Sequence, residues 1–125
     1  MKRAYLVAAV VAVIAVPALA APPRPLTESE HTALRCAAAL AMGTTAQARG
    51  EGWTRAYPPL AARGREFFVR LTARLMDDAG LDQAGIKAAA LAEATALRRS
   101  GGPAPVMPFC LRLLDAQPGL VAPAR

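Results

Sequence analysis

The sequence has few of the side chains from which most active sites are built. It contains one histidine, His31, and after position 20 it contains two serines, Ser29 and Ser100. Nucleophilic catalysis needs a serine, cysteine or threonine beside a base, which is usually histidine. The chain also lacks a glycine-rich phosphate loop, a nucleophile elbow, metal-ligand spacing and a haem-attachment motif. We therefore predict that the protein is not an enzyme and has no catalytic residues, no cofactor and no bound metal.

β-Branched residues are also scarce after position 21, and alanine, which strands disfavour, occupies 31 of the 125 positions. Hydrophobic residues make up 54% of the chain, which argues against disorder despite 11 prolines and 9 glycines. The length suits one domain and is too short for an enzyme with its own cofactor domain. We predict an all-α fold, a small bundle of three main helices plus a short C-terminal helix.

The N-terminus has the three parts of a secretory signal peptide. A positively charged start is followed by an apolar run over 4–16 and a small-x-small end over 18–20. The alternative is a permanent membrane anchor, but the run is short for a spanning helix of about 20 residues and Pro17 interrupts its end. We predict a cleaved signal peptide over 1–20 and a single helical domain over 21–125. The product would be periplasmic or secreted from a bacterium, with no permanent membrane span.

The two cysteines, Cys36 and Cys110, fit an oxidising compartment. An even number of cysteines in a small exported domain is typical of a disulfide framework. Residues 36 through 110 would form a closed loop of 75 residues, a constraint worth about 4 kcal/mol on the chain-entropy argument. The alternatives are free buried thiols or a reactive pair, which usually has the Cys-x-x-Cys spacing. We predict a structural disulfide that clamps the bundle.

Hydrophobic spacing and capping signals predict the helices. Thr27 and Glu30 form a capping box before a helix whose apolar residues surround almost its whole circumference, as in a central helix. His31 lies in its first turn, where we expect a solvated side chain. Gly43 either weakens this helix or marks a close contact with another one. Residues 21–26 form a proline-rich lead-in that we expect to be extended or mobile. The predicted helices cover about 28–48, 58–78, 82–99 and 108–116.

The second and third helices have clear start and stop signals in the sequence. Pro58 or Pro59 is expected in the first turn of the second helix, where proline is tolerated, and Gly80 is expected to cap its end. Asp82 is a good N-cap for the third. The apolar stripe of the second helix is the clearest in the chain, and its members are Leu60, Gly64, Phe67, Phe68, Leu71 and Leu75. The buried stripe predicted for the third helix consists of Ile86, Ala90, Ala94 and Leu97.

One stretch of the chain is both basic and aromatic. Residues 49–74 hold six arginines against two glutamates, and four of the five aromatic residues outside the signal peptide. Arginine beside tryptophan and tyrosine is the composition of interface anchors, and it could also meet anionic lipid headgroups or lipopolysaccharide phosphates. The plainer interpretation is an aromatic core beneath a solvated arginine face. The candidate binding surface consists of Trp53, Arg55, Tyr57, Arg63 and Arg65.

Several short stretches, covering most of the mature chain, carry a resemblance. They are 35–39, 47–51, 58–61, 64–69, 107–111 and 114–116. Their order resembles that of small, uncharacterised secreted alphaproteobacterial proteins that are helical and have one Cys–Cys pair. The resemblance implies export and a helical fold with a Cys–Cys link, and it implies no activity. The architecture also looks loosely like that of the acid-stress chaperones of the enterobacterial periplasm, in topology alone.

Three functions remain open from the sequence. The first is an exported, non-enzymatic binding protein whose partner is another protein or an anionic envelope surface. The second is a periplasmic stress chaperone of the holdase type, whose pH switch would have to rest on carboxylates because the chain has one histidine. The third is a carrier of an apolar or anionic lipid-like ligand, in a cavity lined by Leu60, Phe67, Phe68 and Leu71. Export excludes nucleic acid as a partner despite the net charge of +6.

Overall fold

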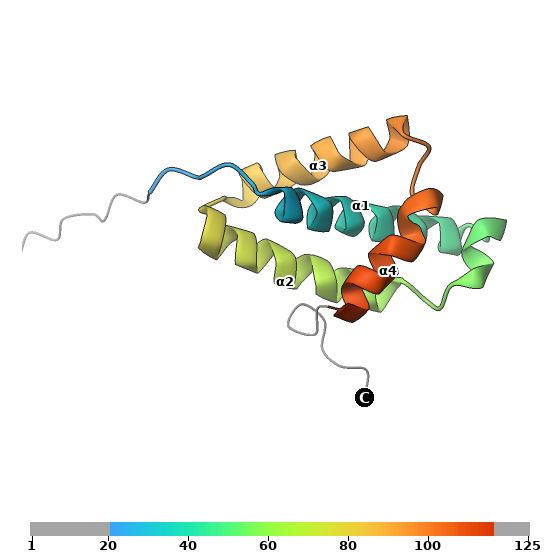
Figure 1. The fold of residues 1–125 in the computed structure, drawn as a ribbon. Helices are drawn as coiled ribbons and strands as arrows, with labels where there is room; N and C mark the ends of the chain where they lie inside the picture. Colours follow the sequence, from blue (N-terminus) through green and yellow to red (C-terminus); the bar gives the residue numbers. More distant parts are fainter. Residues whose placement is uncertain (1–20, 117–125) are drawn as a thin grey trace, which may run out of the picture.

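The computed structural model describes residues 21–116, which fold into helices joined by short loops, with no strand in that range (Figure 1). The predicted signal peptide and the last nine residues lie outside the described part of the chain. The prediction of three main helices and a short C-terminal one is confirmed. The elements are α1 (Glu28–Ala48), the 3₁₀-helix η1 (Gly52–Ala56), α2 (Ala61–Ala79), α3 (Gln83–Arg99), the 3₁₀-helix η2 (Ala104–Val106) and α4 (Met107–Ala116).

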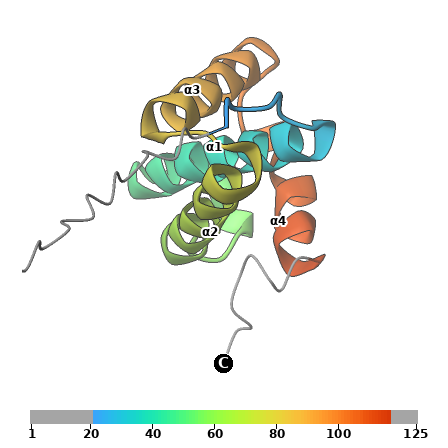
Figure 2. The same cartoon turned by 90° about the vertical axis from the view of Figure 1, so that its left-hand side faces the viewer.

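The central helix of the bundle is α1. It contacts α2, α3 and α4, and Figure 2 shows α2 and α3 on either side of it with α4 against a third side. Gly43 of α1 lies in close contact with side chains from other elements. A Cβ atom built at Gly43 would lie 2.7 Å from Cε of Met107 and 2.8 Å from Cδ1 of Leu60. The interpretation of Gly43 as the mark of a close contact is therefore confirmed.

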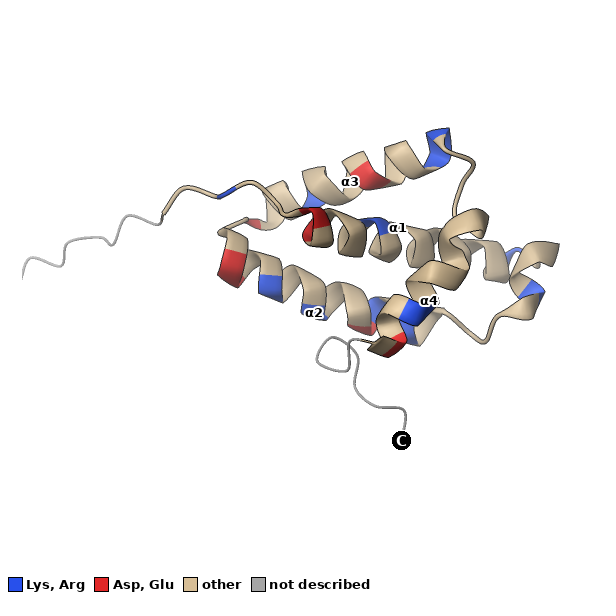
Figure 3. Ribbon diagram, in the orientation of Figure 1, with Lys and Arg blue, Asp and Glu red and all other residues tan. Residues whose placement is uncertain are grey.

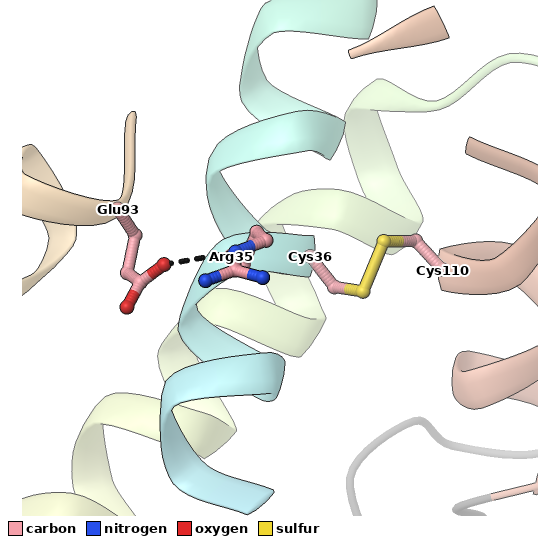
Figure 4. The surroundings of a disulfide bond; sticks show 4 residues. All are labelled: Arg35, Cys36, Glu93 and Cys110. Atoms are coloured by element: carbon pink, nitrogen blue, oxygen red, sulfur yellow. Dashed lines mark hydrogen bonds and ion pairs between the residues drawn. A yellow bond between two sulfur atoms is a disulfide. The ribbon is translucent and has the colours of Figure 1, made fainter. Parts of the chain in front are cut away.

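A disulfide between Cys36 and Cys110 joins α1 to α4, as predicted. The two Cα atoms are 5.2 Å apart and both side chains are buried. Arg35 and Cys36 are adjacent in α1 and point toward different helices, Arg35 toward Glu93 of α3 and Cys36 toward Cys110 of α4 (Figure 4). One turn of α1 thus makes both of these links.

The predicted caps of α1 and α3 form as expected. The Thr27 hydroxyl accepts from the Glu30 backbone N–H at 3.2 Å, and the Glu30 carboxylate accepts from the Thr27 N–H at 2.8 Å. The Asp82 carboxylate accepts from the Gly85 N–H at 2.8 Å. Gly80 ends α2 with a φ of 70°, a left-handed conformation that favours glycine.

The start of α2 differs from the prediction. The helix begins at Ala61, so both prolines precede it and neither lies in its first turn. Gln47 of α1 explains this, because its side chain donates to the Pro58 carbonyl at 2.9 Å and accepts from the Leu60 N–H at 2.9 Å. These two bonds hold the prolines against α1 before the helix starts. The loop predicted over 50–59 also contains η1.

The lead-in before α1 has no regular secondary structure, but Arg24 anchors it to the end of α2. The Arg24 backbone N–H donates to the Ala79 carbonyl at 3.0 Å, and its Nε donates to the Asp78 carbonyl at 3.2 Å. Its guanidinium also makes two bonds to the Glu30 carboxylate, at 2.9 and 2.8 Å. Arg24 therefore supplies donors to carbonyls at the end of α2 that have no partner within the helix.

This arrangement predicts a pH dependence. The hydrogen bonds from Arg24, followed by that from the Thr27 backbone, lower the pKa of Glu30 to about 2. A carboxylate with a lowered pKa in the folded state stabilises it above the unfolded-state pKa, and loses that contribution as the pH falls through the folded-state pKa. Urea denaturation should therefore find wild type more stable than Glu30→Gln by a constant amount above about pH 5. The difference should shrink between about pH 4.5 and about pH 2.

The control for this prediction is Glu28→Gln. It removes the same charge from the same turn of α1 without touching Arg24, so it accounts for the helix dipole. A stability difference for Glu30→Gln that stays the same from pH 7 to pH 2 would contradict the prediction.

Candidate functional site

An open groove lies between α2 and α3, with α1 as its floor. It encloses about 920 Å³. We call it the three-helix groove. Its lining comes from α1 (Ala37, Ala38, Ala41, Met42, Thr44, Thr45), α2 (Ala61, Gly64, Arg65, Phe68, Thr72, Met76) and α3 (Gln83, Ile86, Lys87, Ala90, Leu91, Ala94, Arg98).

The position of the groove follows from how α4 is attached. Cys36 fixes α4 to one side of α1. Ala38 and Thr45, which line the groove, lie roughly 180–200° around the helix from Cys36, at about 100° per residue. The short helix therefore covers the side of α1 opposite the groove. Figure 2 shows α4 against a side of α1 that neither α2 nor α3 covers. From the turn that joins them, α2 and α3 diverge (Figure 1), and the groove lies between them.

The walls of the groove expose large apolar side chains. Phe68 and Met76 are each 40% exposed and Leu91 is 59% exposed. The floor has small side chains instead, such as Ala38 and Ala41. Water therefore meets apolar side chains from all three helices in the groove.

The charge of the groove has one sign. Its lining includes three cationic side chains, Arg65 from α2 and Lys87 and Arg98 from α3, and no aspartate or glutamate. Figure 3 shows basic positions, in blue, along both α2 and α3. Lys87 and Arg98 are eleven residues apart on α3, which is about 16 Å along the helix axis. The positive charge is thus spread over both walls.

The candidate binding surface predicted from the sequence is divided between three places. Trp53 and Arg55 lie in η1, and Tyr57 follows it, with the Trp53 and Tyr57 rings edge to face at a centroid distance of 6.2 Å. Arg63 faces α4, where it pairs with Asp115 at 2.6 Å. Arg65 lines the three-helix groove. The structure therefore brings the first three together and separates the two arginines of α2.

Trp53 is half-buried, and part of its ring packs against the core beside Gly43. Its Nε1 donates to the Glu51 carboxylate at 3.0 Å. Arg55 and Tyr57 border a shallow hollow between η1 and the end of α1. The Trp53 side chain therefore has a structural role as well as an exposed edge.

The cavity expected for a carried ligand does not have the expected lining. Leu60, Phe67 and Leu71 are buried in the core, whereas Phe68 points into the three-helix groove. Adjacent residues on a helix point about 100° apart, so Phe67 and Phe68 face different surroundings. The four residues do not line one surface, because Phe68 lines the three-helix groove and Leu60, Phe67 and Leu71 do not.

Glu93 is the functional candidate that the sequence reasoning missed. It lies on α3 and is 8% exposed. One of its carboxylate oxygens lies 2.9 Å from Nδ1 of His31. The other accepts from Nε of Arg35 at 3.0 Å (Figure 4). His31, expected to be solvated, is half-exposed and has this partner. The signal in the sequence was the spacing of Glu93 from Ile86 and Leu97, which places a charge within the buried stripe of α3.

The ion pair between Arg35 and Glu93 links α1 to α3, and its coupling energy can be measured. Arg35→Ala should lower the free energy of unfolding by about 1–2 kcal/mol, because the buried carboxylate of Glu93 loses a charged donor. In the Glu93→Met background no buried charge remains, so the same change should cost close to nothing. The double-mutant cycle, measured by urea denaturation, isolates this coupling. A coupling energy below about 0.3 kcal/mol would show that the pair is incidental.

No protein-family model, no curated protein and no solved structure matches the chain. Within residues 21–116, none of the helices has the length and apolar character needed to cross a membrane. In the same range, histidine, cysteine, aspartate and glutamate side chains do not gather in a group of three that could hold a metal ion.

Proposed function

We propose that this protein is an exported, non-enzymatic binding protein and that it binds through the three-helix groove. The observation that supports this is the exposure of Phe68, Met76 and Leu91 around a floor of small α1 residues. Leaving such a surface in water is unfavourable, by roughly 25 cal/mol per Å² of apolar area. An apolar partner seated in the groove would remove that area from water and gain affinity from it.

The groove shares one residue, Arg65, with the surface that the sequence predicts. Trp53, Arg55 and Tyr57 remain candidates for a second contact with a protein or with an anionic envelope surface. Arg63 is the weakest member of the set, because its guanidinium already pairs with Asp115.

Export is supported by the disulfide, since such bonds persist in oxidising compartments and are rare in the cytosol. The test is expression of the full chain in a bacterium, followed by intact mass measurement of the periplasmic fraction. We expect a product that begins at Ala21 and is lighter by two hydrogens than the reduced chain. A full-length, reduced product in the cytoplasm would contradict the proposal.

A carrier of an anionic lipid-like ligand is the second candidate function. The volume of the groove, about 920 Å³, lies within the range of roughly 300–1,000 Å³ that small-molecule sites occupy, and its rim is basic. The holdase alternative stays a prediction. An acid pulse that increases dye binding to apolar surface would support it, and unchanged dye binding down to about pH 2 would oppose it.

Binding at the groove can be tested with N-phenyl-1-naphthylamine, a neutral apolar dye that fluoresces when it leaves water. We expect saturable binding to the oxidised protein. Ala41→Trp fills the floor of the groove from an exposed position and should weaken that binding at least tenfold. Ala73→Trp is the matched control, because Ala73 is exposed on α2 and does not line the groove.

Circular dichroism would confirm that both variants are folded. Dye binding that is unsaturable, or that both tryptophan variants weaken equally, would rule out the groove as the binding site.

A further inference from the structure

We infer that the occupant of the three-helix groove is an amphipathic α-helix of a partner protein, with acidic side chains along both edges of its apolar face. This inference rests on the proposed function, because it names the chemistry of the partner for the same site. Length, close packing and charge support it.

The length of the groove suits a helix. Its wall on α2 extends from Ala61 to Met76, fifteen residue steps or about 22 Å at 1.5 Å per residue. A helix of about fifteen residues would lie alongside it. Helix-in-groove binding of this kind uses anchors at i, i+3, i+4 and i+7, and Phe68, Met76 and Leu91 offer the facing apolar surface.

The floor of the groove allows close packing. Ala38 and Ala41 of α1 present little side chain there, so a helix backbone can approach to the 8–10 Å between axes that packed helices adopt. Three sides of α1 are covered by α2, α3 and α4. A bound helix would cover the fourth side and complete the surroundings of the central helix.

The distribution of charge favours a helix over a single lipid headgroup. The cations lie on both walls, with Arg65 on α2 and Lys87 and Arg98 on α3. Lys87 and Arg98 are separated by about 16 Å, so one headgroup meets one end of the groove and leaves the other unmatched. Acidic side chains along both edges of a helix can meet all three cations. A second copy of this chain would bring basic rims together, and like charges in contact are unfavourable.

The experiment uses a synthetic sixteen-residue peptide with leucine and alanine on one helical face and glutamate on both edges. Its partner peptide has lysine in place of every glutamate. Isothermal titration calorimetry of the exported, oxidised protein should give at least tenfold tighter binding of the acidic peptide. Binding should weaken as the salt concentration rises, because the pairs are near the surface.

Two variants at the end of α3 locate the charge contact. Arg98 lines the groove and Arg99 does not, while both lie in the last turn, where they interact equally with the helix dipole. Arg98→Glu should weaken binding of the acidic peptide at least fivefold, and Arg99→Glu should change it less than twofold.

Each outcome separates this inference from the proposed function. If the dye binds and the acidic peptide does not, the helix inference is wrong and the groove remains a binding site. Palmitate binding that depends on Arg98, in the absence of peptide binding, would assign the groove to a lipid-like ligand instead. Equal binding of the acidic and basic peptides, or equal effects of Arg98→Glu and Arg99→Glu, would also overturn the inference. If neither the dye nor the acidic peptide binds, the proposed function is wrong as well.

Discussion

Replacing both cysteines, as Cys36→Ala with Cys110→Ala, is expected to lower the free energy of unfolding by about 4 kcal/mol. The disulfide closes a loop that contains most of the described chain, with a sequence separation of 74. Without the disulfide, the unfolded chain can adopt more conformations, which raises its entropy and lowers the stability of the folded state. Domains of this size have a free energy of unfolding of about 5–15 kcal/mol. The double replacement would therefore remove a large share of the total stability.

Urea denaturation checks both the size and the cause of this loss. If the link acts on the unfolded chain, the double variant should also show a steeper dependence on urea, because its unfolded state exposes more surface. The control is wild-type protein at each urea concentration with the disulfide intact. A loss below about 1 kcal/mol with an unchanged slope would contradict the expectation.

The same double variant should destabilise α4 more than the other helices. The helix has ten residues, and helices shorter than about 12–15 residues are marginal on their own in water. Without the covalent link, α4 is held by the packing of Met107 and Leu114 in the core and by the pair between its Asp115 and Arg63 of α2. Hydrogen exchange in the double variant should therefore be faster in α4 than in α2. Equal acceleration in both helices would mean that the link stabilises the bundle as one unit.

The second large effect separates two adjacent phenylalanines of α2. Phe67 is fully buried, whereas Phe68 is 40% exposed in the three-helix groove. Phe67→Ala should cost about 3–5 kcal/mol of stability, because it removes a large core side chain and leaves a cavity. Phe68→Ala changes the same atoms at the neighbouring position and should cost less than about 1 kcal/mol. Thermal or urea unfolding measures both.

Dye binding should be more sensitive to replacement of Phe68 than of Phe67, the reverse of the order expected for stability. Phe68→Ala should weaken the binding of N-phenyl-1-naphthylamine, because Phe68 is part of the apolar wall. Phe67→Leu is a milder core change that keeps the protein folded, and it should leave dye binding within twofold of wild type. Equal losses of stability at the two positions would show that Phe68 belongs to the core and would remove one wall of the proposed site.

Local signals were sufficient for much of the fold. The caps at Thr27, Gly80 and Asp82 were predictable because each depends on a side chain or a backbone conformation within a few residues. The disulfide was predictable because the chain offers one pair of cysteines. The prolines before α2 misled the prediction, since what places them is Gln47, a side chain from a different helix.

The site was harder to predict than the fold for a physical reason. The apolar circumference of α1 indicated a central helix, but it does not say which sides receive a neighbour. Three sides do, and the fourth, at Ala38 and Ala41, became the floor of the groove. Glu93 was missed because a glutamate in a buried stripe makes sense only once Arg35 of another helix is opposite it.

The two cysteines also determine how this protein acquires its cross-link during synthesis. With two cysteines in the chain, one intramolecular pairing exists, so an oxidant is required and a disulfide isomerase has nothing to rearrange. Cys36 is in α1 and Cys110 in α4, the first and last helices of the described residues. Cys36 therefore has no pairing partner in its own chain until Cys110 has been synthesised and α4 packs against α1. Until then it can exchange with the disulfides of small thiols or of other proteins, which forms a mixed disulfide and releases a thiol.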